Sequence, residues 1–311
     1  MRSFPALMYV SFQSAIRQPF FPITTVVAYI FILSTPAFTM FTLMNAKKLV
    51  LDMSMATILM VELAVSILAT SSIVAGEVEE KTTTLLLSKP VSRLTFLLAK
   101  FSAIALALLF VLLPLVCVLI MTLRMGVPEA AYSEVKYPIL WFAFLPLIGA
   151  VIVSAGANYY ADKNFASTFV ISLNIFVLIA LLLLYLIEKN SLMINLFYPA
   201  FFLWMAGVVI SPVASVFSLG GRIFFTLIFS FLIFILGLTT NYLLGNILHL
   251  PGIALLYSLI PNFQVFWVED SWVKGKAIPI SYLWSVVRYV FLYCMAMLLL
   301  GWSLWERREI S

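Results

Sequence analysis

The hydrophobic residues of this chain lie in long, nearly uninterrupted stretches. A bilayer core of about 30 Å needs about 20 apolar residues in helical form, because only a helix satisfies its own backbone hydrogen bonds in lipid. Eight stretches reach this length, whereas the apolar residues 250–261 are too few to cross. The pattern predicts an all-α polytopic membrane helix bundle with about eight spans, at residues 20–44, 53–75, 96–123, 139–160, 166–187, 197–217, 223–245 and 280–305.

Two further segments accompany the predicted spans. Residues 5–18 place their apolar side chains on one helical face, which predicts an interfacial helix within residues 1–19, lying along the membrane before the first span. Residues 246–279 contain the short apolar stretch and are expected to form an outer re-entrant or loop segment. We therefore expect residues 1–311 to form a single transmembrane domain without a separate soluble domain.

Composition excludes an ordinary water-soluble enzyme. Hydrophobic residues make up 64% of the 311 residues and charged residues only 10%, with a mean hydropathy of +1.13. Soluble domains have about 45–50% apolar and about 25% charged residues. Cys117 and Cys294 both lie in apolar stretches, and His249 is the sole histidine. We expect no catalytic residue, metal site or cofactor in this chain, and no nucleic acid as a partner.

The distribution of Lys and Arg predicts the orientation of the chain. With the N-terminus inside, the inner loops hold more Lys and Arg residues than the outer loops, as the positive-inside rule requires. An even number of spans then places both termini in the cytoplasm. We expect the protein to be integral to the cell (cytoplasmic or inner) membrane, with membrane lipid around it.

Residues 76–95, between the second and third predicted spans, contain the densest cluster of charges in the chain. Val78, Thr82, Leu85 and Leu86 fall on one helical face, whereas charged residues and Thr84 occupy the rest. This predicts a short amphipathic cytoplasmic helix. It is either a solvated loop with a helical turn, or a helix whose apolar face docks in a groove of a cytoplasmic partner.

The same segment resembles the signature of permease subunits of ABC transporters of the type-two export class. The residues that carry the resemblance are Glu77, Glu79, Thr82, Leu85, Leu86, Leu87, Pro90, Val91, Ser92, Arg93 and Lys100. The amphipathic N-terminal helix and the C-terminal residues 305–309 are also similar to that class. The chain departs from it in two respects: Lys81 stands where many relatives have Gly, and such permeases usually have six spans, so the expected number is six to eight.

The resemblance implies that residues 77–88 form a coupling helix against a separate ABC ATPase subunit, which binds ATP and Mg. A second permease copy, identical or related, would complete the transporter, which would export an unknown substrate. This chain has no Gly-x-x-x-x-Gly-Lys-Ser/Thr phosphate loop of its own, so hydrolysis would belong to the partner. The expected partner-binding residues are Glu77, Glu79, Glu80, Thr82, Leu85, Leu86, Pro90 and Arg93.

Four further residues are candidates for function. Asp162 and Lys163, in the inner loop between the fourth and fifth spans, form either a second ATPase contact or a polar turn. Glu62 and Arg288 are the ionisable residues deepest in the predicted spans, and a charge there is costly unless it is paired or faces water. They form an ion pair, or Glu62 is protonated or faces a polar cavity while Arg288 extends to the outer surface.

Two other functions stay open at this point. An ATP-independent secondary carrier would use acidic or polar groups at mid-membrane, and typically has inverted repeats, which we do not find in the sequence. A polytopic interaction protein without transport would use the cytoplasmic helix only to recruit a partner.

Overall fold

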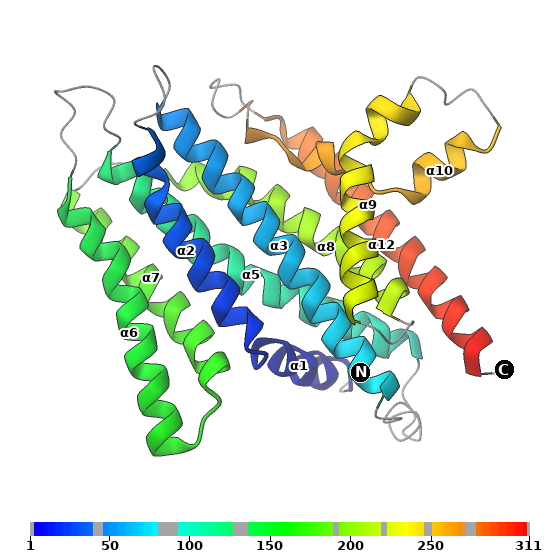
Figure 1. Ribbon diagram of the computed structural model, residues 1–311, viewed down its shortest axis with the longest axis horizontal. Helices are drawn as coiled ribbons and strands as arrows, with labels where there is room; N and C mark the ends of the chain where they lie inside the picture. Colours follow the sequence, from blue (N-terminus) through cyan, green and yellow to red (C-terminus); the bar gives the residue numbers. More distant parts are fainter. Residues whose placement is uncertain are drawn as a thin grey trace. The chain divides into compact units, whose positions relative to one another are not determined.

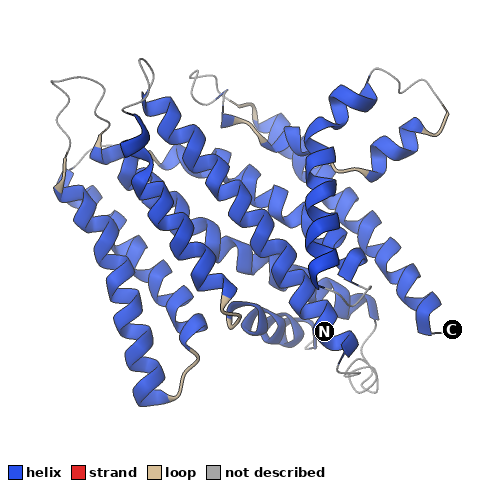
Figure 2. Cartoon of the chain, in the orientation of Figure 1, coloured by secondary structure: helices blue, strands red, loops and turns tan. Residues whose placement is uncertain are grey.

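The apolar stretches form helices in the computed structural model, which describes residues 3–39, 46–79, 93–126, 136–188, 193–218, 223–245, 251–269, 271 and 278–309. Figure 2 shows the described residues almost entirely in helices, with no strand among them. The α-helices are α1 (Ser3–Ile16), α2 (Phe20–Phe38), α3 (Ala46–Glu79), α5 (Arg93–Met125), α6 (Pro138–Ala161), α7 (Phe165–Glu188), α8 (Phe197–Ser218), α9 (Ile223–Leu244), α10 (Ile253–Leu259) and α12 (Ile280–Glu309). Two short 3₁₀ helices, η2 (Ile194–Leu196) and η4 (Phe263–Phe266), precede α8 and follow α10.

Eight helices within the described residues are long and apolar enough to cross a membrane, which confirms the predicted spans. They are α2, α3, α5, α6, α7, α8, α9 and α12. The helix of the second span begins before the predicted residue 53, because α3 and its candidate span start at Ala46. Lys47, Lys48 and Asp52 suggested a loop, but a helix can continue into the headgroup region, where charged residues are solvated.

The chain divides into two compact units. One contains Met1–Ser11, Ser66–Ala105 and Met205–Ser311, and we refer to it as the C-terminal unit. The other contains Phe12–Val65 and Leu106–Trp204, and we refer to it as the N-terminal unit. The boundaries fall inside α1, α3, α5 and α8, so these helices contribute residues to both units.

In the N-terminal unit, α6 and α7 form an antiparallel hairpin that packs closely along its length, and α2 contacts α7 (Figure 1). The Tyr29 hydroxyl group of α2 donates a hydrogen bond of 2.7 Å to the Ala143 carbonyl oxygen of α6. The Asn174 side chain of α7 donates one of 2.9 Å to the Phe110 carbonyl oxygen of α5. Each bond satisfies a polar side chain within a candidate span, where the hydrocarbon core of a bilayer would offer no water as a partner.

In the C-terminal unit, α3 and α8 are joined through the Ser66 hydroxyl group, which donates a hydrogen bond of 2.6 Å to the Gly207 carbonyl oxygen. Small residues allow such close approach of helices in membranes. A Cβ atom at Gly301 of α12 would lie 3.6 Å from the Val216 side chain of α8, which is ordinary contact. Gly207 of α8 thus lies at a contact with α3, and Gly301 of α12 lies beside α8.

Many hydroxyl groups within the spans are satisfied by their own helix. Thr25 donates to the Phe21 carbonyl oxygen at 2.8 Å, and Thr122 to that of Val118 at 2.8 Å. This bond to a carbonyl oxygen one turn earlier lets a hydroxyl group enter an apolar region at little cost. Prolines inside the described helices include Pro36, Pro114, Pro146 and Pro212.

Candidate functional site

The predicted coupling segment lies between α3 and α5, and the structure describes only its two ends. Glu77 and Glu79 belong to the last turns of α3, and Arg93 is the first residue of α5. Glu80, Thr82, Leu85, Leu86 and Pro90 lie outside the described residues. A helix over the whole of residues 77–88 therefore stays a prediction. Its first three residues are helical, because they continue α3, the helix of the second span.

The two helices that end at this segment are the longest in the described chain. α3 has 34 residues and α5 has 33 residues. At a rise of 1.5 Å per residue each is about 50 Å long, well beyond the about 30 Å of a hydrocarbon core. Both helices thus continue past the membrane-spanning region, and α3 does so without a break between Ile73 and Glu79.

The connection between α6 and α7 is a tight, hydrogen-bonded turn. Asp162 adopts a left-handed backbone conformation with φ 48°, and its N–H donates to the Ala157 carbonyl oxygen, which ends α6. The Asn158 side chain donates a hydrogen bond of 2.8 Å to the Lys163 carbonyl oxygen. The Asn164 side chain accepts one of 3.0 Å from the Ser167 N–H, which caps the start of α7.

This turn presents polar and aromatic groups to its surroundings. Asp162 and Lys163 are both exposed, and the rings of Tyr159 and Tyr160 are 81% and 87% exposed. The two rings meet edge to face with centroids 5.0 Å apart. The structure thus brings the two predicted residues together on an ordered turn, with two tyrosines that the sequence interpretation did not consider. Such a turn can act as a small contact surface.

Glu62 is fully buried on α3, in the interior of a candidate span. Neither of its carboxylate oxygens has a hydrogen-bond partner among the described residues. Ser66 and Thr70 follow at intervals of four residues and are also buried, so α3 carries a polar face. Arg288, by contrast, has an exposed side chain on α12. Their ion pair stays a prediction.

A network of amide and hydroxyl groups joins α10 and the residues that follow it, 260–269, to α9. At its centre is Asn241, whose side-chain oxygen accepts hydrogen bonds from the Tyr257 hydroxyl group at 2.7 Å and from the Asn262 side chain at 3.0 Å. The Asn241 amino group donates to the Gln264 side-chain oxygen at 2.8 Å. Gln264 in turn donates to the Leu238 carbonyl oxygen at 2.6 Å. α10 and the segment that follows it are therefore fixed to α9 by four hydrogen bonds.

The same segment is fixed to α12 by tyrosine hydroxyl groups. Tyr289 accepts a hydrogen bond of 2.8 Å from the Asn262 N–H, and Tyr293 donates one of 2.8 Å to the Leu259 carbonyl oxygen. Tyr282 donates one of 2.8 Å to the Val265 carbonyl oxygen. The sequence interpretation missed this network because its members are far apart in the chain. The available signal was the occurrence of Asn241 in an apolar helix.

Gly237 permits this arrangement. A Cβ atom there would clash with the Pro261 carbonyl oxygen and would lie 2.6 Å from the Phe263 ring. Phe263 packs on Phe234 of α9 with ring centroids 5.0 Å apart. A cavity of about 610 Å³ lies between the segment and α12, and Tyr257, Tyr289 and Tyr293 are among the residues that line it.

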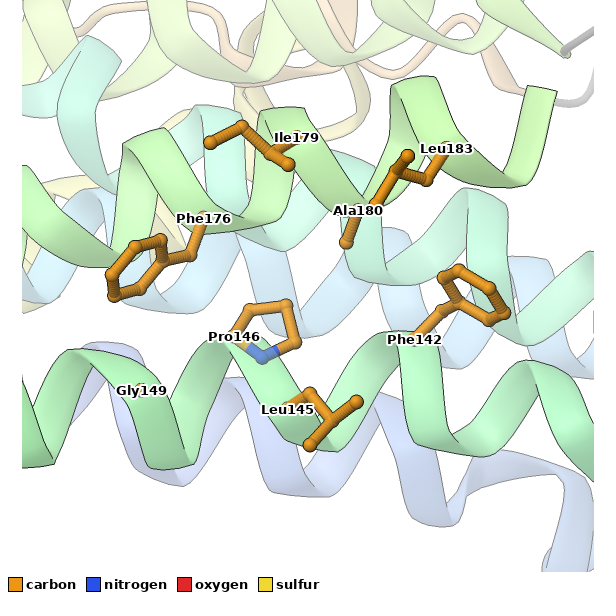
Figure 3. Close-up of a pocket in the computed structure, with 8 residues that line it drawn as sticks. All are labelled: Phe142, Leu145, Pro146, Gly149, Phe176, Ile179, Ala180 and Leu183. Carbon is orange, nitrogen blue, oxygen red and sulfur yellow. The ribbon is translucent and has the colours of Figure 1, made fainter. Parts of the chain in front are cut away.

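A second cavity, of about 290 Å³, lies between α6 and α7. Figure 3 shows Phe142, Leu145 and Pro146 on α6 opposite Phe176, Ile179, Ala180 and Leu183 on α7. All of its lining side chains are apolar, so it can hold a hydrocarbon group but offers no group for chemistry. Among the described residues, no cluster of three or more His, Cys, Asp or Glu side chains could hold a metal ion.

Together these elements define an all-α polytopic membrane protein. Its helices contain the buried polar groups, and the turns between them present exposed ones. Comparisons with known protein families, with curated protein sequences and with solved structures found no match to this chain.

Proposed function

We propose that this chain is the membrane-spanning permease subunit of an ATP-driven ABC transporter of the type-two export class. The observation that carries the proposal is the resemblance of the segment from Glu77 to Lys100 to the signature of that class. The segment lies between the two longest helices of the described chain, α3 and α5. A displacement of residues 77–88 would therefore act directly on two membrane-spanning helices.

In this proposal a separate ATPase subunit binds ATP and Mg and moves the coupling helix. Leu85 and Leu86 would supply the buried apolar contact, and Glu77, Glu79 and Glu80 would orient the helix by charge. Pro90 and Arg93 would mark the transition to α5. The transporter would contain a second permease copy, identical or related, and would export a substrate whose chemistry the chain does not define.

Asp162 and Lys163 would form a second, smaller contact with the ATPase. Support comes from the exposure of both side chains on a turn that is held by several hydrogen bonds. A rigid turn loses little conformational entropy when a partner binds.

One observation favours the secondary carrier as the alternative. Glu62 is fully buried in a candidate span, and both of its carboxylate oxygens lack a hydrogen-bond partner in the described part of the chain. An ionisable residue inside a membrane often belongs to an ion or proton pathway. An ATP-independent carrier would transport at full rate without an ATPase subunit, which distinguishes it from the proposed permease. A polytopic interaction protein would bind its partner but transport nothing.

The proposal is tested by Leu85→Asp, which places a charge on the apolar face of the coupling helix. We expect the variant to fold but to lose co-purification with the ATPase subunit. Thr84→Asp is the matched control, because it adds the same charge on the other face of the predicted helix and should retain the ATPase. Retention of the ATPase by the Leu85→Asp variant would contradict the docking proposal.

The cytoplasmic placement of the segment is tested by labelling. A Ser88→Cys variant should react with a membrane-impermeant maleimide only from the cytoplasmic side. The native thiols of Cys117 and Cys294 are buried and should give little background. Labelling of residue 88 from the outer side would contradict the proposal.

A further inference from the structure

A groove in the N-terminal unit combines an apolar wall with a single cationic side chain at one end. It has a volume of about 630 Å³, within the range of small-molecule sites, and lies between the start of α2, α6 and the start of α7. Ile23 and Val27 of α2, Val151 of α6, and Phe169 of α7 are among the apolar residues that line it. Figure 1 shows these three helices side by side.

The polar end of the groove is formed by Arg17 and Asn164. Arg17 lies in the short connection between α1 and α2, its side chain is exposed, and its guanidinium group has no hydrogen-bond or ion-pair partner among the described residues. The side-chain oxygen of Asn164 accepts the Ser167 N–H. Asp162 and Lys163, on the adjoining turn, carry opposite charges and cancel formally. The net charge at this end of the groove is therefore that of Arg17.

The walls of the groove are exposed apolar surface within the candidate spans. Ile23 and Val27 are 61% and 64% exposed, and both lie in the α2 candidate span. An exposed apolar surface on a membrane-spanning helix is covered by acyl chains or by another protein. A cation at the end of the span, where headgroups begin, adds a preference for an amphiphile with an anionic head. The groove thus matches a phospholipid whose tail lies along α2 and whose headgroup meets Arg17.

We propose that this groove binds one anionic phospholipid from the leaflet at which α2 begins, with Arg17 as the headgroup contact. A zwitterionic phospholipid fills the same apolar wall but brings no net charge to Arg17, so it binds more weakly. The inference is independent of the proposed transport function, because it uses none of the coupling residues.

The test is native mass spectrometry of the full chain in micelles that contain equal amounts of dioleoyl phosphatidylglycerol and dioleoyl phosphatidylcholine. We expect one retained phosphatidylglycerol per chain, with about a fivefold preference over phosphatidylcholine, the factor that corresponds to about 1 kcal/mol per basic residue. Arg17→Gln should abolish the preference, and Arg17→Lys should retain most of it. Lys136→Gln, which removes a charge at an exposed position outside the groove, should leave it unchanged.

A second pair of variants tests the apolar wall. Val151→Trp fills the groove and should reduce retention of both lipids, whereas Ile152→Trp changes an exposed neighbour that does not line it and should reduce neither. Absence of a lipid preference in the wild-type chain would overturn the proposal, as would a preference that persists in Arg17→Gln or lipid retention that is unchanged in Val151→Trp. Loss of a dimer, rather than of lipid, in Val151→Trp would assign the groove to a second copy of the chain instead.

Discussion

Tyr29 reaches from α2 to the backbone of α6, where its hydroxyl group donates a hydrogen bond of 2.7 Å to the Ala143 carbonyl oxygen. The side chain is fully buried. Three residues further along α6 is Pro146, which has no N–H to donate to the Phe142 carbonyl oxygen one turn earlier. The hydroxyl group of Tyr29 therefore joins α2 to the turn of α6 that the proline weakens.

Tyr29→Phe removes this hydrogen bond and keeps the ring. We expect a loss of stability of about 0.5–1.5 kcal/mol, the usual range for a single hydrogen bond, including one between membrane helices. Reversible unfolding in mixed micelles with increasing SDS measures the change. Tyr159→Phe is the control, because the Tyr159 side chain is largely exposed. Equal effects of the two substitutions would show that the Tyr29 hydrogen bond does not contribute to stability.

Gly237→Ala introduces a methyl group where the Pro261 carbonyl oxygen and the Phe263 ring already lie. Because the backbone oxygen cannot move away cheaply, the segment that follows α10 should separate from α9 and lose its contacts with Asn241. We expect destabilisation of about 2 kcal/mol or more, in the range of overpacked cores. Faster proteolysis near residue 261 would give a second readout.

Gly156→Ala is the matched control for this prediction. A Cβ atom at Gly156 of α6 meets no atom within 4 Å, so alanine should be neutral or stabilise the helix by up to about 1 kcal/mol. If Gly237→Ala proves as harmless as Gly156→Ala, the close approach of Pro261 to α9 is not present in the protein.

Two substitutions of Asp162 distinguish the effect of its left-handed backbone conformation on stability from a contact of its carboxylate with the ATPase. Asp162→Gly should stabilise the chain by a few tenths of a kcal/mol to about 1 kcal/mol, because glycine adopts the left-handed conformation without strain. Thermal unfolding measures this change. If the carboxylate also contacts the ATPase, Asp162→Asn should weaken co-purification without a loss of stability. Full retention of the ATPase by Asp162→Asn would remove Asp162 from the contact.

Glu62→Gln distinguishes the two arrangements that the sequence left open. Since both carboxylate oxygens lack a hydrogen-bond partner in the described residues, we expect the neutral amide to cost less than about 0.5 kcal/mol, or to stabilise the chain. Arg288→Gln, at an exposed position, should also be nearly neutral. The measurement is the yield of folded protein together with unfolding in mixed micelles.

An ion pair would give the opposite result. Both single substitutions would then reduce the yield strongly, because each leaves a charge without its partner in the membrane. The exchange of the two residues, Glu62→Arg together with Arg288→Glu, would restore it.

The sequence by itself predicted the all-α membrane fold and its eight spans, because the length of an apolar stretch is a local property that the bilayer translates directly into a helix. The outer placement of residues 246–279 and the partner roles of Asp162 and Lys163 stay predictions from the sequence. The coupling helix over residues 77–88 stays a prediction from the sequence, since most of it lies outside the described residues.

Only the tertiary structure decided which polar groups meet. Asn241 and Gln264 are more than twenty residues apart, and their hydrogen bond depends on the fold of the chain after α10 and on the space beside Gly237. The burial of Glu62 and the groove at Arg17 likewise depend on which helix faces pack together. Hydropathy assigns a residue to the membrane, but its neighbours there are set by helix packing, which a single-chain pattern of apolar residues does not encode.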